Sequence, residues 1–163
     1  YGIYLYYEDQ PVIAGNTIVA LPTEEYYGIY LETCYSKLSV QKNQLDINGS
    51  GNAYGIYLLN SSSSQGEEGS IANNFIRVNT HSGTYGIWTN SHYQDIDFNS
   101  VHVTGNAPTS AALYATNTYS AFRNNIFSSG ADGLAAAIMT SSSDFPSPVC
   151  STFSLCFLIR LDR

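Results

Sequence analysis

A five-residue word, YGIYL, occurs three times in this chain, at residues 1–5, 27–31 and 54–58. The variant YGIWT stands at 85–89, and AALYA and AAAIM continue the series at 111–115 and 135–139. Self-similarity at a period of this size predicts a solenoid, in which each unit stacks on its neighbours. The central residues of the series are 25 to 31 positions apart: Ile3, Ile29, Ile56, Ile87, Leu113 and Ile138.

A second mark, an asparagine followed two positions later by an aliphatic residue, keeps phase with the first over five units. The longest interval contains NSSSSQGEEGS at 60–70, whose residues are typical of loops. An insertion confined to one corner of the repeat is how solenoid loops behave. The marked asparagines are Asn16, Asn43, Asn74, Asn99 and Asn124.

The segments around each asparagine alternate apolar and polar residues, which indicates short β-strands. Apolar residues stand three positions before each asparagine, from Ile13 in the first unit to Ala121 in the last. Each unit then holds three short strands and three turns, too little for a crossover that contains a helix. The sequence therefore predicts an all-β parallel β-helix of about six coils over residues 1–145, with coils stacked about 4.8 Å apart.

The asparagine column has a structural interpretation. Asparagine tolerates a positive φ at a sharp turn, and its side chain can bond the neighbouring backbone. Identical amides stacked in register can also donate hydrogen bonds from coil to coil, as in a ladder. We expect the five marked asparagines to form such a ladder and to have no catalytic role.

The repeated pattern GIYL…IxxNxI resembles the right-handed parallel β-helix repeat of the pectin-lyase-like superfamily, and most of all that of large secreted or cell-surface repeat proteins of bacteria. The stretch FRNNIFSSG…AAAIMTSSSDF at 122–145 is similar to their late coils. The resemblance implies an extracellular or bacterial cell-surface location. Because the chain opens inside a repeat, we expect a fragment whose parent chain supplies further coils. The superfamily holds lyases, hydrolases, epimerases, adhesins and stalks, so the fold does not select a function.

If the isoleucine of each word points into the core, its neighbours point outward. Gly2, Gly28, Gly55 and Gly86 precede the isoleucine, and an aromatic residue follows it. Flat rings beside a strip of glycines suit contact with sugar rings, and the resemblance implies that β-helix polysaccharide enzymes bind substrate on this sheet. The alternative is structural, since aromatic pairs on neighbouring strands stabilise a sheet by about 0.2–1 kcal/mol. The candidate carbohydrate-binding column is Tyr4, Tyr30, Tyr57, Trp88 and Tyr114.

Outward charged positions offer a weaker candidate for catalysis. Asp46, Arg77 and His102 stand three residues after consecutive marked asparagines, and Asp95 and Asp97 flank an inward isoleucine on the coil of His102. Paired carboxylates can hydrolyse glycosides, and a β-elimination lyase needs a calcium-binding Asp cluster and a base. The alternative is a solvated face with weak ion pairs. The motifs of the superfamily's pectin hydrolases and pectate lyases are absent.

Composition excludes several classes of partner and cofactor. The net charge of −7, with six Lys and Arg in all, leaves no basic stripe for nucleic acid or for an anionic membrane. The three cysteines form no disulfide framework or zinc spacing. Paired glutamates in turns offer oxygen ligands, but no EF-hand or nonapeptide calcium pattern is present. We predict no cofactor and no metal, with Ca²⁺ left as an alternative.

After Asp144 the repeat pattern stops. Residues 146–163 contain two Pro and two Cys but no marked asparagine, and their apolar stretch is too short for a membrane span. This tail is either a cap on the last coil or an artefact of the reading frame. Near-identical repeats, low charge and one modest insertion favour a non-catalytic module: a stalk, an adhesin or a carbohydrate-binding face. The alternative is a polysaccharide lyase or glycoside hydrolase.

Overall fold

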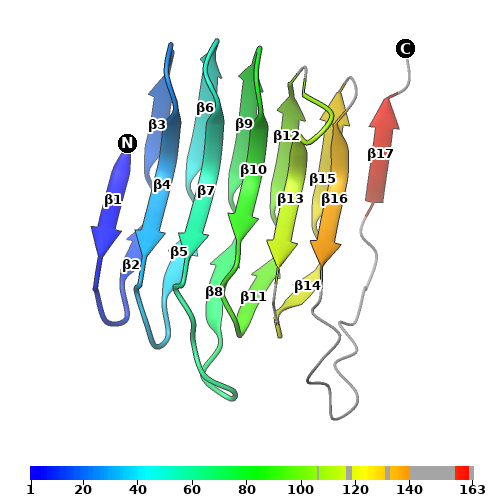
Figure 1. The fold of residues 1–163 in the computed structure, drawn as a ribbon. Helices are drawn as coiled ribbons and strands as arrows, with labels where there is room; N and C mark the ends of the chain where they lie inside the picture. Colours follow the sequence, from blue (N-terminus) through cyan, green and yellow to red (C-terminus); the bar gives the residue numbers. More distant parts are fainter. Residues whose placement is uncertain (106, 117–118, 131–132, 140–156, 162–163) are drawn as a thin grey trace.

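The computed structural model describes residues 1–105, 107–116, 119–130, 133–139 and 157–161. The described residues form seventeen strands and no helix, and therefore no helix that could cross a membrane. The strands belong to three sheets, and every neighbouring pair of strands is parallel. Figure 1 shows the sheets wrapped around one axis, with the first strand at one end of the stack.

Each complete coil contributes one strand to each sheet. The first sheet consists of β1 (Ile3–Tyr6), β4 (Tyr26–Glu32), β7 (Ala53–Leu59), β10 (Thr84–Thr89), β13 (Ala111–Thr116) and β16 (Leu134–Met139). The second sheet consists of β2 (Val12–Ala14), β5 (Ser39–Gln41), β8 (Gly69–Ala72), β11 (Gln94–Asp97) and β14 (Ala121–Arg123). The third sheet consists of β3 (Thr17–Ala20), β6 (Gln44–Gly49), β9 (Phe75–Thr80), β12 (Ser100–Thr104), β15 (Ile126–Gly130) and β17 (Phe157–Leu161). The predicted parallel β-helix is confirmed, with five complete coils and the strands β16 and β17 beyond them.

The core lies between the three sheets and is built from columns of identical register. On the first sheet Ile29, Ile56 and Ile87 pair in sequence, and each is fully buried. Comparable columns of Val, Ile, Leu and Phe line the second and third sheets. Complete burial of such a side chain is worth roughly 1.5–3 kcal/mol, so the repeated inward positions account for much of the stability.

The glycines of the YGI words face the core, and the expectation that they face outward is wrong. A Cβ atom on Gly28 would lie 2.6 Å from Leu45 Cδ2, and one on Gly55 would lie 2.6 Å from Ile76 Cγ2, both on the third sheet. Glycine and the isoleucine after it therefore both point inward, which breaks the alternation of the strand. Only glycine leaves room there for the side chains of the third sheet.

The last coil is displaced by one residue from the expected register. Phe122 pairs with Ile96, and Phe127 pairs with Val101, so the inward positions are not those of Ala121 and Ile126. On the next strand of the first sheet, Ala136 and not Ile138 pairs with Leu113. Two large aromatic side chains therefore fill the core at the level of this coil, and both are 1% exposed.

The tail expected at 146–163 is described only at β17, which pairs with β15 in parallel from Ile126–Phe157 to Gly130–Leu161. Cys150 and Cys156 lie outside the described residues. Residues 60–68 of the insertion form a loop between β7 and β8 that protrudes from the stack and contains a tight turn (Figure 1). Ser64 and Glu67 form an antiparallel bridge there, and Gly66 between them has a φ of 85°.

Candidate functional site

The outward side of the first sheet carries two adjacent columns of aromatic rings, which we call the aromatic face. One column is the predicted one, Tyr4, Tyr30, Tyr57, Trp88 and Tyr114. The other column, which strict alternation of the strand would place in the core, is Tyr1, Tyr27, Tyr54 and Tyr85. Because glycine and isoleucine both turn inward, the first tyrosine of each word shares the outer surface with the second. The inward glycine was the signal that could have identified this second column.

The rings of the second column stack on one another along the solenoid axis. In the predicted column Tyr57, Trp88 and Tyr114 stack, whereas Tyr30 meets Tyr57 edge to face at 89°. Tyr27 and Tyr54 have centroids 4.7 Å apart and planes at 5°, and Tyr57 and Trp88 have centroids 4.3 Å apart and planes at 10°. Between the columns some rings meet edge to face, as Tyr54 and Tyr57 do at 81°, and others stack, as Tyr27 and Tyr30 do at 23°. Each such pair adds about 0.5–1.5 kcal/mol beyond burial. Where the rings stack, their faces cover one another, so a ligand there meets chiefly ring edges, hydroxyl groups and the indole N–H.

Exposure varies along the predicted column. Tyr4 at its end is 44% exposed, and Tyr57, Trp88 and Tyr114 are half-buried. Tyr30 is only 9% exposed because the rings of Tyr4, Tyr57 and their neighbours surround it. Tyr30 therefore packs against the neighbouring rings and offers little exposed area for contact with a ligand.

Two carboxylates border this surface and bind phenol groups. Tyr4 donates a hydrogen bond to Glu32 Oε2 at 2.7 Å, and Tyr27 donates one to Glu25 Oε1 at 2.8 Å. The bond to Glu32 raises the pKa of Tyr4 to about 12. Burial, together with the bond to Glu25, raises the pKa of Tyr27. These phenols are therefore protonated donors at neutral pH.

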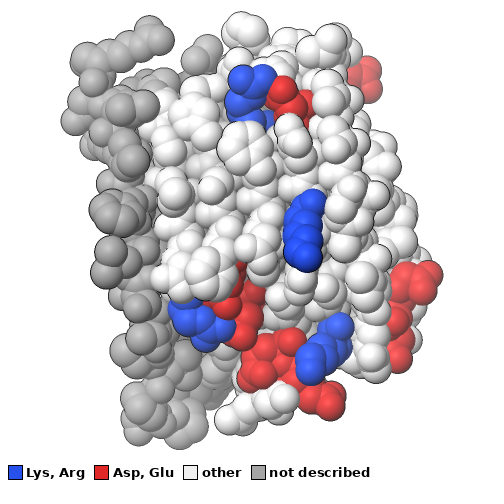
Figure 2. Space-filling model, turned by 180° about the vertical axis from the view of Figure 1, so that it is seen from behind, with Lys and Arg blue, Asp and Glu red and all other residues white. Residues whose placement is uncertain are grey.

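The five residues proposed for acid–base chemistry fall on two sheets. On the third sheet Arg77 binds Asp46 through two bonds, Nε to Oδ1 at 2.9 Å and Nη2 to Oδ2 at 2.6 Å. The bonded guanidinium lowers the pKa of Asp46. His102 on the same sheet lies 3.0 Å from Ser128 Oγ through its Nδ1. In Figure 2, which shows the molecule from behind, most basic side chains lie beside acidic ones on a largely uncharged surface.

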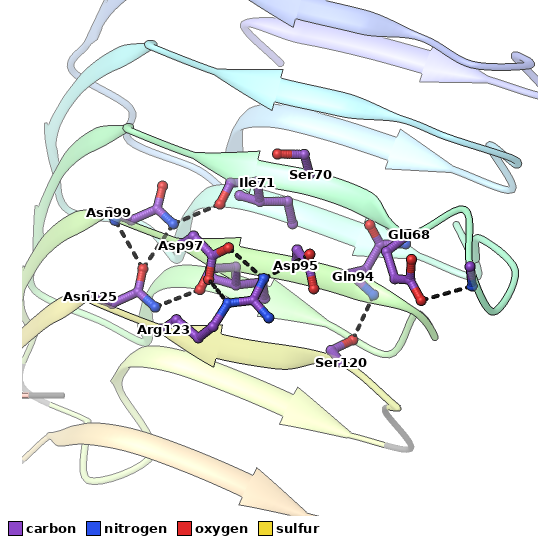
Figure 3. Close-up of polar contacts among 12 residues, drawn as sticks. Glu68, Ser70, Ile71, Gln94, Asp95, Asp97, Asn99, Ser120, Arg123 and Asn125 are labelled. Carbon is purple, nitrogen blue, oxygen red and sulfur yellow. Dashed lines mark hydrogen bonds and ion pairs between the residues drawn. The ribbon is translucent and has the colours of Figure 1, made fainter. Parts of the chain in front are cut away.

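On the second sheet one guanidinium bridges both remaining aspartates. Arg123 Nη2 lies 2.7 Å from Asp95 Oδ2 and 2.7 Å from Asp97 Oδ2 (Figure 3). Sequence reasoning missed Arg123, because the expected register did not place it beside Asp97. Three of the candidate carboxylates are therefore held by arginines. The arrangement is that of structural ion pairs between coils and provides no pair of free carboxylates.

A continuous asparagine ladder runs along the corner between the second and third sheets. Asn43 donates from its backbone N and its Nδ2 to Asn74 Oδ1, both at 3.0 Å, and Asn74 donates in the same way to Asn99. Each of these amides also donates to a backbone carbonyl across the corner, as Asn99 does to Ile71 O at 2.8 Å (Figure 3). Asn16 begins the ladder by donating to Asn43.

The fifth member of the ladder is Asn125, and the prediction of Asn124 is wrong. Asn99 donates from its backbone N and its Nδ2 to Asn125 Oδ1 at 2.9 and 3.0 Å. Asn124 is exposed and takes the turn position with a φ of 55°. The left-handed conformation needed at this turn suits either asparagine of the doublet, but only the second points inward.

The described side chains that could bind a soft metal lie apart from one another. His81 Nδ1 contacts Gly49 O at 3.2 Å, and the Cys34 thiol is buried beside Leu5 O. His92 is half-buried, and burial lowers its pKa. The described residues contain no group of three or more His, Cys, Asp or Glu that could hold a metal ion.

A family model described as "Periplasmic copper-binding protein (NosD)" matches residues 1–145 of the chain. Comparison with curated proteins and with solved structures gave no significant match.

Proposed function

The chain belongs to the NosD family of right-handed β-helices with the pectin-lyase-like fold, and we propose that it is a non-catalytic module that binds carbohydrate outside the cytoplasm through its aromatic face. The observation that carries the proposal is the double column of outward aromatic rings on the first sheet. Rings in this number on one sheet of a mostly polar surface indicate an interaction site.

The geometry of the rings suits an extended, uncharged ligand. Tyr57, Trp88 and Tyr114 repeat along the axis with one ring per coil, and the planes of neighbouring rings differ by 10° and 9°. Their edges present apolar carbon, while the phenol and indole groups offer hydrogen bonds. Sugar chains carry the matching combination of C–H surface and hydroxyl groups. A chain of sugars lying along the axis would contact successive coils in the same way.

The enzymatic alternative has less support. Glycoside hydrolysis needs one carboxyl group that gives a proton and one that acts as base or nucleophile. Asp46, Asp95 and Asp97 each bind an arginine, and His102 contacts a serine on another sheet from Asp95 and Asp97. None of these groups borders the aromatic face, where a sugar chain would lie.

Copper binding, which the family description names, does not fit the described residues. Thiolate, thioether and imidazole groups are the ligands that copper favours. His81 and His92 occupy different turns, His102 contacts Ser128, and the one described cysteine, Cys34, is buried. Burial also raises the pKa of the Cys34 thiol, which disfavours the thiolate that would bind a metal. We therefore assign no copper-dependent step to this part of the chain. The word "periplasmic" in the description does agree with the proposed location outside the cytoplasm.

The proposal is tested by glycan-array screening, followed by pull-down on the polysaccharides that bind. Trp88→Ala and Tyr57→Ala are expected to weaken binding about tenfold each, the equivalent of roughly 1.4 kcal/mol. Phe75→Ala is the matched control, because Phe75 is exposed but lies on the third sheet. Circular dichroism checks that each variant is folded. If no glycan binds, or if binding responds equally to all three substitutions, the proposed function is wrong.

A further inference from the structure

Two sets of described carboxylates differ in their hydrogen-bonding and ion-pair partners. Those of Asp46, Asp95 and Asp97 are neutralised by arginines one coil away. Those of Glu25 and Glu32, which border the aromatic face, have no Lys or Arg partner among the described residues and bind only phenol groups. A carboxylate that accepts one phenol hydrogen bond retains further acceptor sites and its full negative charge.

Glu25 and Glu32 both bind tyrosines whose rings contact Tyr30. Glu32 binds Tyr4, which packs on Tyr30 with centroids 5.1 Å apart. Glu25 binds Tyr27, whose ring stacks on Tyr30 at 5.0 Å. After burial, the charges of both glutamates contribute to the raised pKa of Tyr57. The aromatic rings of the second and third coils therefore lie in a negative electrostatic potential, which arises from the glutamates at the two ends of β4.

Cations are missing from the whole first sheet. Its six strands contain no Lys or Arg, and the Lys and Arg among the described residues stand elsewhere in the fold: Lys37 and Lys42 in turns, Arg77 and Arg160 on strands of the third sheet, and Arg123 on the second sheet. A polymer of uronic acids would bring its own negative charges against Glu25 and Glu32, with no basic side chain to offset the repulsion. A protonated amine would instead meet free carboxylate oxygens and electron-rich rings, which attract cations.

We propose that the part of the aromatic face formed by Tyr4, Tyr27, Tyr57, Glu25 and Glu32 selects glycans that carry protonated amines, that is, amino-sugar polymers with free amino groups, over uronic acid polymers. The inference rests on the proposed carbohydrate-binding function and names its ligand class. The aromatic columns supply contact area for any sugar chain. The two carboxylates supply the preference for a positive one.

The experiment compares three probes by isothermal titration calorimetry at mildly acidic pH: a glucosamine oligomer, the N-acetylated oligomer of equal length, and an oligogalacturonate. We expect the amine form to bind about tenfold more tightly than the acetylated form at low salt. We expect the advantage to shrink as salt is raised, because exposed charges are screened. Oligogalacturonate is expected to bind least.

Glutamate-to-glutamine substitutions remove the negative charge of a side chain and keep its size, so they test the contribution of charge to binding by itself. Glu25→Gln and Glu32→Gln are each expected to reduce affinity for the amine form about threefold and to leave affinity for the acetylated form unchanged. Glu67→Gln, an exposed glutamate in the 60–70 insertion, is the matched control and is expected to change neither. Equal binding of amine and acetylated probes, or a preference that survives both substitutions, overturns this inference and leaves the proposed function intact. Binding of no probe or other glycan overturns the proposed function.

Discussion

Two adjacent asparagines provide a matched test of how the coils stack. Asn125 is 1% exposed and accepts hydrogen bonds from the backbone N and the Nδ2 of Asn99, while its own Nδ2 donates to Ile96 O at 2.6 Å. Asn124 is exposed, with a φ of 55°, and takes no part in the ladder. The same substitution at the two positions should therefore have very different effects.

Asn125→Ala leaves the buried backbone N–H of Asn99 without its acceptor and removes a donor from the Ile96 carbonyl. Each buried polar group left unsatisfied costs about 1–3 kcal/mol, so we expect the free energy of unfolding to fall by roughly 4 kcal/mol. Asn124→Ala breaks no such bond and only places an alanine in the left-handed region, at a cost of about 1 kcal/mol. Asn124→Gly should remove even that cost.

Urea denaturation measures both effects. Far-UV circular dichroism follows the sheets, and the fluorescence of Trp88, the single tryptophan, follows the coil that holds Asn99. The denaturation midpoint should drop strongly for Asn125→Ala and only slightly for Asn124→Ala, with an unchanged slope if unfolding remains two-state. If Asn124→Ala is as damaging as Asn125→Ala, or if Asn125→Ala costs less than about 1 kcal/mol, the register of the last coil is wrong.

Two further predictions concern packing and pH. Gly55→Ala should destabilise the protein by about 1–3 kcal/mol in the same urea assay, because its Cβ would meet Gly86 O at 2.5 Å and Ile76 Cγ2 at 2.6 Å. Gly83→Ala should have a much smaller effect, because its Cβ would lie 3.2 Å from Asn52 Oδ1 and 4.0 Å from Tyr85 Cε2, and equal losses would contradict an inward-facing glycine column. Burial lowers the pKa of His92, so the unfolded chain binds a proton that the folded chain resists, and stability should fall as pH drops below about 6.5. His92→Gln should reduce this dependence in denaturation midpoints measured between neutral and mildly acidic pH, and an unchanged dependence would assign it to other groups.

The sequence was sufficient to predict the three-strand coil, because two marks with different chemistry kept the same period. It was insufficient where strict alternation fails. Gly28 and Ile29 both face inward, and nothing in a period of two residues predicts two consecutive inward positions. Strict alternation would place Tyr27 and its column in the core, and the same departure puts them on the surface, where they form the second column of the aromatic face.

The charged candidates show a second limit. The correct and incorrect registers of the last coil differ by one residue, and the doublet of Asn124 and Asn125 places an asparagine at the corner in both. Only Asn124 is followed two positions later by an aliphatic residue, so the asparagine mark selected the incorrect register. The incorrect register aligned Arg123 with Phe98, so its bridge to Asp95 and Asp97 was not foreseen. In the folded protein the register that buries Phe122 and Phe127 is the one adopted, because these side chains fill more of the core than Ala121 and Ile126 would. A pattern of apolar and polar residues carries no information about the volume that the core has to fill.

The asparagine ladder also determines how the molecule should respond to force. Every bond of the ladder joins one coil to the next, so tension applied along the solenoid axis loads these bonds in series. Neighbouring coils are separated by 26 residues at Ile3 and Ile29, so a coil that detaches releases about 90 Å of extended chain. The protein should therefore lengthen in discrete steps of that size under axial load, coil by coil from an end, as an extensible spacer does.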